Sequence, residues 1–171
     1  MSRLHVLTSC SRPGNLPAVA ESIAAAASDS WEVCWHVRFD LKHLHVGGQQ
    51  LKNDMLDGIT DGWVVFLDDD TTMHPGLLAS AAKVADVGAV IVSQERSDGT
   101  ILRAARENLQ VGLVDIGQAI LRRDLIGDAR IPIDYNGDGM FLAGLLRDTP
   151  AVAFVDEILS FHNSLTTAVA A

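Results

Sequence analysis

The chain is short of cysteine and of basic residues. Its 171 residues include two cysteines, Cys10 and Cys34, which lack CxxC spacing, so neither a disulfide framework nor a zinc site is indicated. A reducing, cytoplasmic compartment is the expected setting. Lysine and arginine number 13 against 22 acidic residues, for a net charge of -9. This balance argues against nucleic acid as the main partner, because a phosphate backbone is bound by clustered cations.

Long apolar runs are also missing. No stretch approaches about eighteen uninterrupted apolar residues, and residues 1–10 lack the apolar core of a signal peptide. The small apolar tail at residues 165–171 is too short to span a bilayer, so we expect no transmembrane segment. With 48% hydrophobic and 20% charged residues, the composition favours one substantial core and a single domain over residues 1–171.

Strand and helix patterns alternate along the chain. Trp31, Val33, Trp35 and Val37, for example, alternate with more polar residues, which is the period of a strand. Strands are predicted at 4–8, 31–37, 63–67, 88–93, 116–122 and 152–161, and helices at 16–27, 49–59, 75–87 and 140–147. This order predicts an α/β fold with a mixed, mostly parallel sheet and helices on both faces, in which ligands bind beyond the carboxyl ends of the strands.

Three consecutive aspartates are the most informative feature. Asp68, Asp69 and Asp70 directly follow the apolar run at residues 63–67. Carboxylates this close repel one another and raise each other's pKa, and a divalent cation or a strong set of donors is the usual compensation. The triplet therefore predicts a metal and ligand site, although an acidic turn with solvated side chains has the same composition.

Further polar groups follow the first two predicted strands. Thr8, Ser9 and Arg12 come after the first strand, and Asp40 comes after the second. Because the carboxyl ends of parallel strands share one edge, we expect these groups to face one crevice together with the aspartates. Arg12 can neutralise a phosphate or bind a carboxylate, but solvated loop arginines are as common. Asp40 can accept a hydrogen bond from a ribose or a base, but it is also a common turn former.

Three segments together resemble a known family. They are Leu7-Thr8-Ser9-Cys10-Ser11-Arg12-Pro13 with Asn15-Leu16, then Lys52-Asn53, and then Val65-Phe66-Leu67-Asp68-Asp69-Asp70. In order and spacing they resemble the GT-A glycosyltransferases, most closely the inverting family-two enzymes. The resemblance covers most of the chain. It implies a single GT-A domain of the hexosyltransferase type, which transfers a sugar from a nucleoside diphosphate sugar to a hydroxyl acceptor.

The resemblance also implies roles for single residues. Thr8 and Arg12 would lie by the nucleotide. Lys52-Asn53 would be the basic residue and asparagine of the helix before the acidic strand, and this pair would also bind the sugar nucleotide. The aspartates would form a D-x-D motif that binds the sugar nucleotide through Mn²⁺ or Mg²⁺. Asp68 would then hold the nucleoside side, Asp69 the ribose or a metal-bound water, and Asp70 the metal.

A second set of positions extends the resemblance. Residues 117–123 resemble the family's glycine-led strand that ends in a basic pair, which would place Arg122 near the donor sugar and its diphosphate. His162 follows the last predicted strand and resembles the histidine that some members add to the metal. Neutral imidazole suits Mn²⁺ better than Mg²⁺. A lone histidine is as often a solvated side chain, and we interpret His36, His43 and His45 in that way.

Inverting transfer also requires a base, because the acceptor hydroxyl loses its proton as it attacks. The segment Tyr135-Asn136-Gly137-Asp138-Gly139-Met140-Phe141-Leu142 lies where the family carries a Glu-Asp pair before an apolar helix, and Asp138 falls on the aspartate. Gly137 replaces the glutamate, and whether Asp134 substitutes for it stays open. The alternative is a simple turn with Asp138 near a helix start.

Two other functions fit part of the sequence. Asp68-x-Asp70-x-Thr72 after an apolar strand resembles the first motif of the haloacid-dehalogenase-like phosphatases, with Ser93 as a second motif. That family requires a later lysine or arginine and a paired acidic motif, whereas the last lysine is Lys83 and no second acid follows Asp138 shortly downstream. A non-catalytic protein that binds sugar nucleotides is the other alternative, because 171 residues leave little sequence for an acceptor platform.

Overall fold

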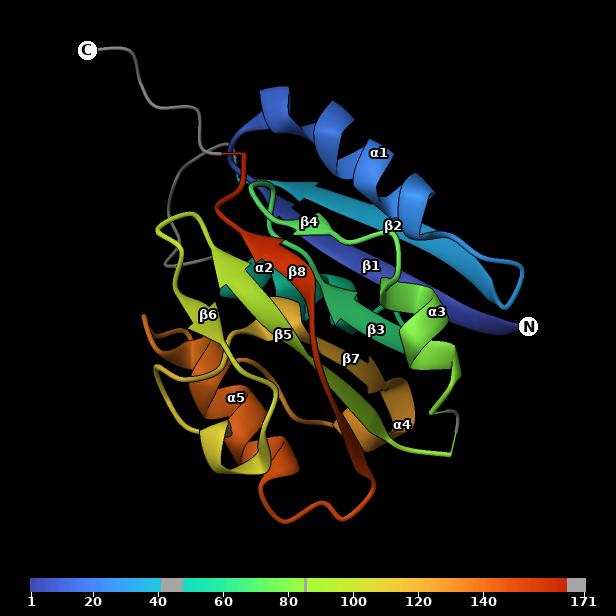
Figure 1. The fold of residues 1–171 in the computed structure, drawn as a ribbon. Coiled ribbons are helices and arrows are strands. Elements are labelled where there is room, and N and C mark those ends of the chain that lie inside the picture. The colour runs from blue at the N-terminus through green and yellow to red at the C-terminus, as the bar shows by residue number, and fades with distance from the viewer. Residues whose placement is uncertain (41–47, 85, 166–171) are drawn as a thin grey trace.

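The protein is built around one mixed sheet. The structure is a computed structural model that describes residues 1–40, 48–84 and 86–165. Among these residues the strands are β1 (Ser2–Cys10), β2 (Trp31–Phe39), β3 (Trp63–Phe66), β4 (Thr72–Met73), β5 (Ala89–Arg96), β6 (Ile101–Leu102), β7 (Ala119–Arg122) and β8 (Val152–His162). Their order across the sheet is β2-β1-β3-β7-β5-β8-β4, with β6 beside β5. Figure 1 shows the twisted sheet between its helices.

Most strands run in one direction. β1, β2, β3, β5 and β8 point the same way, whereas β4, β6 and β7 are antiparallel to their neighbours. The carboxyl ends of β1, β3, β5 and β8 therefore lie at one edge of the sheet. The prediction of a mixed, mostly parallel α/β sheet is confirmed.

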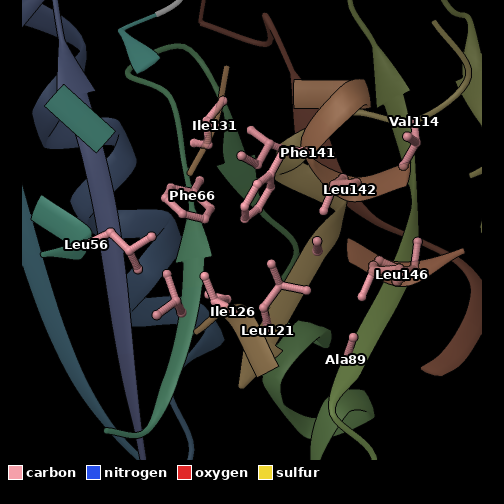
Figure 2. Close-up of a cluster of buried hydrophobic side chains, with 14 of the residues drawn as sticks. Leu56, Phe66, Ala89, Val114, Leu121, Ile126, Ile131, Phe141, Leu142 and Leu146 are labelled. Atoms are coloured by element: carbon pink, nitrogen blue, oxygen red, sulfur yellow. The ribbon is translucent and has the colours of Figure 1, made fainter. Parts of the chain in front are cut away.

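Helices cover both faces. They are α1 (Leu16–Ala26), α2 (Gln49–Leu56), α3 (Leu77–Ala82), α4 (Arg123–Ile126) and α5 (Gly137–Leu146), joined by short 3₁₀ turns at Pro13–Asn15, Arg106–Asn108 and Ile116–Gln118. Successive strand residues enter opposite layers: Val65 packs with residues of α1 and α3, and Phe66 packs with residues of α2 and α5. Figure 2 shows Phe66 beside Phe141 in the second layer. Burial on both faces explains why the central strands are continuously apolar.

Several predicted elements differ from the structure in their bounds, two of them most clearly. Residues 116–122 form a 3₁₀ turn followed by β7, because Asp115 starts the turn with a capping box. Its carboxylate accepts from the Gly117 N–H at 2.9 Å, and the Gln118 side chain accepts from the Asp115 N–H at 2.8 Å. The helix predicted at 75–87 is shorter, since α3 spans Leu77–Ala82. No helix among the described residues is long and apolar enough to cross a membrane.

Candidate active site

Asp69 anchors the loop between β1 and α1. Its carboxylate accepts from the backbone N–H groups of Ser11 and Arg12 at 2.6 and 2.5 Å, and from the Arg12 guanidinium at 2.6 Å. Burial opposes the charge of Asp69, but these donors outweigh it and hold its pKa below the usual range. Asp69 is 1% exposed, so it positions the loop instead of presenting a carboxylate at the surface.

Arg12 also binds the third aspartate. Its Nη2 lies 2.5 Å from Asp70 Oδ2, and the other oxygen of Asp70 accepts from the Thr71 hydroxyl at 3.3 Å. Burial would lower the pKa of Arg12, but the bonds to Asp69 and Asp70 outweigh it and raise the pKa. One guanidinium therefore neutralises two carboxylates of the triplet.

Lys52 neutralises the first aspartate from below. Its side chain is wholly buried, and its Nζ lies 2.8 Å from Asp68 Oδ1, which Ser9 Oγ also approaches at 3.3 Å. Burial would lower the pKa of the ammonium, but the charges of Asp68 and Asp138 outweigh it and raise the pKa. The Asp68 side chain keeps 23% of its surface exposed, so it is the aspartate of the triplet that lines a pocket.

Asn53 fixes the wall of the site opposite the aspartates, which is formed by the segment that leads into α5. Its amide donates to the Ile131 carbonyl at 2.9 Å and accepts from the Ile131 N–H at 2.9 Å. These bonds hold the segment that leads into α5, where Asp138 sits in the first turn. Gly137 just before it is wholly enclosed, since a Cβ there would lie 2.2 Å from the Pro132 carbonyl oxygen. The close backbone approach explains why no glutamate can stand at this position.

Asp138 has the electrostatics of a proton acceptor. Burial, followed by the charges of Asp68 and Asp115, raises its pKa, while Lys52 and His162 lower it; the result is a pKa of about 6. Its Oδ1 is buried and has no hydrogen-bond partner among the described residues. A carboxyl in this state is ionised near neutral pH and is more basic than an ordinary aspartate.

A pocket of about 470 Å³ collects these groups at the carboxyl edge of the sheet. It is lined by Gln49, Asp68, Arg96, Ser97, Asp98, Gly112, Val114, Asp115, Tyr135, Asn136, Asp138, Gly139, His162 and Asn163. The structure thus brings together Asp68, Asp138 and His162, which the sequence placed in one site. His162 stands opposite Arg96 in the β5–β8 pairing, and its Nδ1 is 3.4 Å from the Thr71 hydroxyl that also bonds Asp70.

Three of the eight buried polar atoms that lack a hydrogen-bond partner in the described part of the chain belong to residues that line this pocket. They are Gln49 Oε1, Arg96 Nε and Asp138 Oδ1. An unpaired buried polar atom costs about 1–3 kcal/mol, so such atoms are expected where a ligand completes the hydrogen bonding. The pocket is therefore suited to a ligand rich in donors and acceptors.

Other predicted residues lie outside the pocket lining. Thr8 is fully buried and its hydroxyl accepts from Trp35 Nε1 at 2.9 Å. Asp40 follows β2, and its N–H donates to the Cys10 carbonyl at 2.8 Å. His36 lies on β2, with its Nε2 3.0 Å from His5 Nδ1. His43 and His45 lie outside the described residues.

Arg122 is not brought to the site. Because β7 runs antiparallel to β3, Arg122 pairs with Trp63 at the start of β3, whereas the aspartates follow its end. Its guanidinium binds Asp124 instead. The glycine end of this segment lies near the site, since a Cβ on Gly117 would lie 3.6 Å from Thr71 Cγ2. The expectation that Arg122 lies near the diphosphate is therefore wrong.

Arg96, Asp115 and Gln49 are among the lining residues that the sequence did not assign to the site. Arg96 closes β5, three residues beyond the end predicted for that strand, so a longer strand would have placed it at the edge. Asp115 carries a visible signal, because it precedes Gln118 by three residues as in a capping box. Gln49 begins α2 and gives no signal of its own in the sequence.

The residues fit a divalent cation only in part. Carboxylate oxygens with one imidazole are a donor set that suits Mn²⁺. However, Arg12 and Lys52 already pair with the aspartates, and among the described residues no group of three or more His, Cys, Asp or Glu side chains is arranged for a metal. A cation at Asp70 Oδ2 would have to displace the Arg12 guanidinium.

The architecture and the position of the site define a GT-A-like glycosyltransferase fold. The TarS 1-349 structure of S. aureus superposes with a TM-score of 0.74 at 14% identity, over 94% of this chain and 60% of that one. TarS 1-349 in complex with UDP-GlcNAc gives 0.71 at 15% identity, over 98% and 62%. A197 from STIV gives 0.51 at 16% identity, over 96% and 83%. No protein-family model and no curated protein matches the sequence.

The chain spans about 60% of the TarS 1-349 length. At this identity the comparison shows the fold and not the activity. The prediction of a GT-A-like fold is confirmed, and the phosphatase alternative gains no support from it.

Proposed function

We propose that this protein is a metal-dependent inverting glycosyltransferase, which moves a sugar from a nucleoside diphosphate sugar to a hydroxyl acceptor. The observation that supports it most is the pocket at the carboxyl edge of a GT-A-like sheet. There the high-pKa carboxyl of Asp138 shares one cavity with Asp68 and His162. Ligands of open α/β sheets bind at this edge.

Asp138 is the base in the proposed reaction. The acceptor oxygen attacks the anomeric carbon, the bond from that carbon to the diphosphate oxygen breaks, and the diphosphate leaves with the electron pair. Asp138 takes the acceptor proton, for which its pKa of about 6 is suited near neutral pH. Inversion follows because attack and departure occur on opposite faces of the sugar.

A uridine diphosphate sugar is the first donor to test. Two of the similar TarS structures are complexes with UDP-GlcNAc and with UDP. A pocket of about 470 Å³ is in the usual range for a small-molecule site, roughly 300–1,000 Å³. Asp40 at the end of β2 and Asp68 in the pocket remain the proposed contacts on the nucleoside side.

The charge of the pocket favours a cation. Asp68, Asp98, Asp115 and Asp138 line it, against one arginine, Arg96. A diphosphate would be repelled by this excess of carboxylates, so Mn²⁺ or Mg²⁺ is the proposed counterion. Asp70 and His162, which share the Thr71 hydroxyl, would hold the cation once Arg12 moves from Asp70. When bound, it would offset charge on the leaving diphosphate, and Arg12 would be free to do the same.

The decisive experiment measures release of UDP from UDP-sugars with Mn²⁺, across a panel of hydroxyl acceptors and with calorimetry of UDP binding. Asp138→Asn should keep UDP affinity and lose roughly 10²–10⁴-fold in turnover. Asp134→Asn is the matched control, because the Asp134 carboxylate is exposed and accepts from the Asn136 N–H within its own loop.

Each failure has its own meaning. Undiminished turnover in Asp138→Asn removes this residue as the base. Binding of UDP without any release would favour the non-catalytic sugar-nucleotide binding protein. Absence of nucleotide binding, with or without Mn²⁺, would overturn the proposed function as a whole.

A further inference from the structure

Exposed apolar side chains gather around the mouth of the pocket. Of the eight large hydrophobic residues that are exposed in the described part of the chain, five lie in two segments, and we call them the rim: Val111, Leu113, Ile133, Tyr135 and Met140. Tyr135 is 88% exposed and lines the pocket. Clustered exposed hydrophobic residues commonly mark a binding surface.

The two segments are in contact. A Cβ on Gly139 of α5 would lie 3.0 Å from Val111 Cα, and Gly112 and Gly139 both line the pocket. In Figure 1 the first turns of α5 lie beside the yellow loop between β6 and β7. The rim is therefore continuous with the edge of the cavity.

Packing in the hydrophobic core does not explain why the rim residues are apolar. Neighbouring residues of the same segments are buried in the layer shown in Figure 2, among them Val114, Ile131 and Phe141. Leu113, Ile133 and Met140 project from these segments and are 46–55% exposed. Residues 109–114 and 139–146 carry no charged side chain, whereas exposed Asp134 stands between Ile133 and Tyr135. Apart from this one carboxylate, the surface suits an apolar partner.

The rim also flanks the proposed base. Tyr135 and Asp138 line the same pocket, so an acceptor hydroxyl that reaches Asp138 brings its own substituent next to the rim at Tyr135. A sugar nucleotide is polar and charged, and it suits the polar wall of the pocket instead. We infer that the acceptor is an amphiphile, whose hydroxyl-bearing head enters the pocket and whose attached alkyl or aryl group packs on the rim. This inference rests on the proposed function.

Tyr135 offers a direct readout, because it is the only tyrosine in the chain. Incorporation of 3-fluorotyrosine gives a single ¹⁹F signal at the rim. We expect octyl glucoside, below its micelle concentration, to shift this signal saturably, and glucose at equal concentration to leave it in place. In Leu113→Ser/Met140→Ser the octyl glucoside affinity should fall by about tenfold, because two apolar contacts are lost.

A second arm separates the acceptor from the donor. Saturating UDP with Mn²⁺ should leave octyl glucoside binding in place, since the rim and the donor pocket are adjacent and distinct. Calorimetry of UDP on the Leu113→Ser/Met140→Ser protein reports whether the pocket is intact. The inference fails if glucose and octyl glucoside shift the signal equally, if the double substitution changes nothing, or if UDP displaces octyl glucoside.

Self-association is a further outcome that would overturn the inference. A ¹⁹F signal that moves with protein concentration alone, together with a dimer in sedimentation, would assign the rim to a second copy of the chain. Failure of the proposed function is recognised separately, because it abolishes UDP binding and leaves the octyl glucoside titration unaffected.

Discussion

Asp138 shows how a single residue acquires its chemistry from its surroundings. The exposed turn that its glycine neighbours suggest would have left it an ordinary carboxylate. Instead the wall held by Asn53 places it in a partly buried position close to the charges of Asp68 and Lys52. The two charges act in opposite directions, and burial decides that the pKa rises.

The pH dependence of turnover follows from this pKa. Because the ionised form of Asp138 accepts the proton, kcat/KM should rise with pH through about pH 6 and level off above it. Lys52→Met removes a cation that lowers the Asp138 pKa, so it should move the rise to higher pH. A pH–rate profile that is flat between pH 5 and 7 would contradict the assignment.

Stability should change with pH in the opposite sense. The folded pKa of about 6 lies above the ordinary value of 3.8, so the folded state binds the proton more tightly. The stabilisation that protonated Asp138 contributes to the folded state is complete below about pH 4 and is lost as the pH rises through about 6. The side chain of Asp138→Asn stays neutral at every pH. Its free energy of unfolding should therefore exceed that of the native protein by about 2 kcal/mol at pH 8, after a discount for partial exposure, and the two values should match at pH 4. Urea unfolding at both pH values measures the difference.

Arg12 should compete with a divalent cation for Asp70. Its Nη2 lies 2.5 Å from Asp70 Oδ2. The Arg12 side chain is partly exposed, which allows the guanidinium to move. Arg12→Ala should therefore bind Mn²⁺ in the absence of nucleotide about 5–10-fold more tightly than the native protein, since an ion pair whose guanidinium is partly exposed contributes about 1 kcal/mol. Paramagnetic resonance of free Mn²⁺ reports the affinity. Arg12→Lys keeps the charge as a control, and equal or weaker affinity in Arg12→Ala would refute the competition.

At the scale of elements, α2 connects the two walls of the pocket. Consecutive residues of this helix serve different partners: Lys52 pairs with Asp68 after β3, and Asn53 bonds Ile131 before α5. The resemblance placed this pair at the nucleotide, but both side chains are buried beneath the pocket. Their visible role is to fix the distance between the acidic strand end and Asp138.

Loss of Asn53 should therefore affect both stability and turnover. Asn53→Ala leaves a buried N–H and a buried carbonyl of Ile131 without partners, at a cost of about 2–4 kcal/mol. Asp54→Ala is the matched control, because Asp54 is exposed and accepts a hydrogen bond from Gln50 on the helix surface. Such a pair contributes about 0.5 kcal/mol to stability. Urea unfolding gives the free energies of unfolding. Equal losses of this free energy in the two variants would argue against a stabilising role of the bonds between Asn53 and Ile131.

The antiparallel strand β7 accounts for the main error at this scale. The sequence shows that residues 119–122 are extended, but it does not show their direction in the sheet. Direction depends on how the chain returns from β5 after the capped turn at Asp115, which is a long-range property. Reversal of β7 moves Arg122 to the far edge and leaves Gly117 near the site.

At the scale of the whole molecule, ligand binding should be visible as stabilisation. UDP with Mn²⁺ at about 100 times its dissociation constant should stabilise the fold by about 2.7 kcal/mol, which raises the Tm by roughly 5–10 °C in a chain of this length. UDP alone should shift the Tm less, and Asp70→Asn should reduce the added effect of Mn²⁺. A Tm that does not respond to UDP in any of these solutions would contradict nucleotide binding.

The sequence by itself determined the layers and the chemistry available at their edge. Apolar strands with continuous burial, helices at regular intervals and acids at a strand end are local patterns. The family resemblance, and not these patterns, implied a shared site for Asp138, His162 and the aspartates, and the pocket lining includes Asp68, Asp138 and His162. Only the tertiary structure decided which charges pair. Arg12 and Lys52 reach the aspartates across about 16–58 residues of chain, and no local pattern encodes contacts of that separation. The apolar rim is tertiary for the same reason, since it arises where residues 111–113 and 133–140 are folded together.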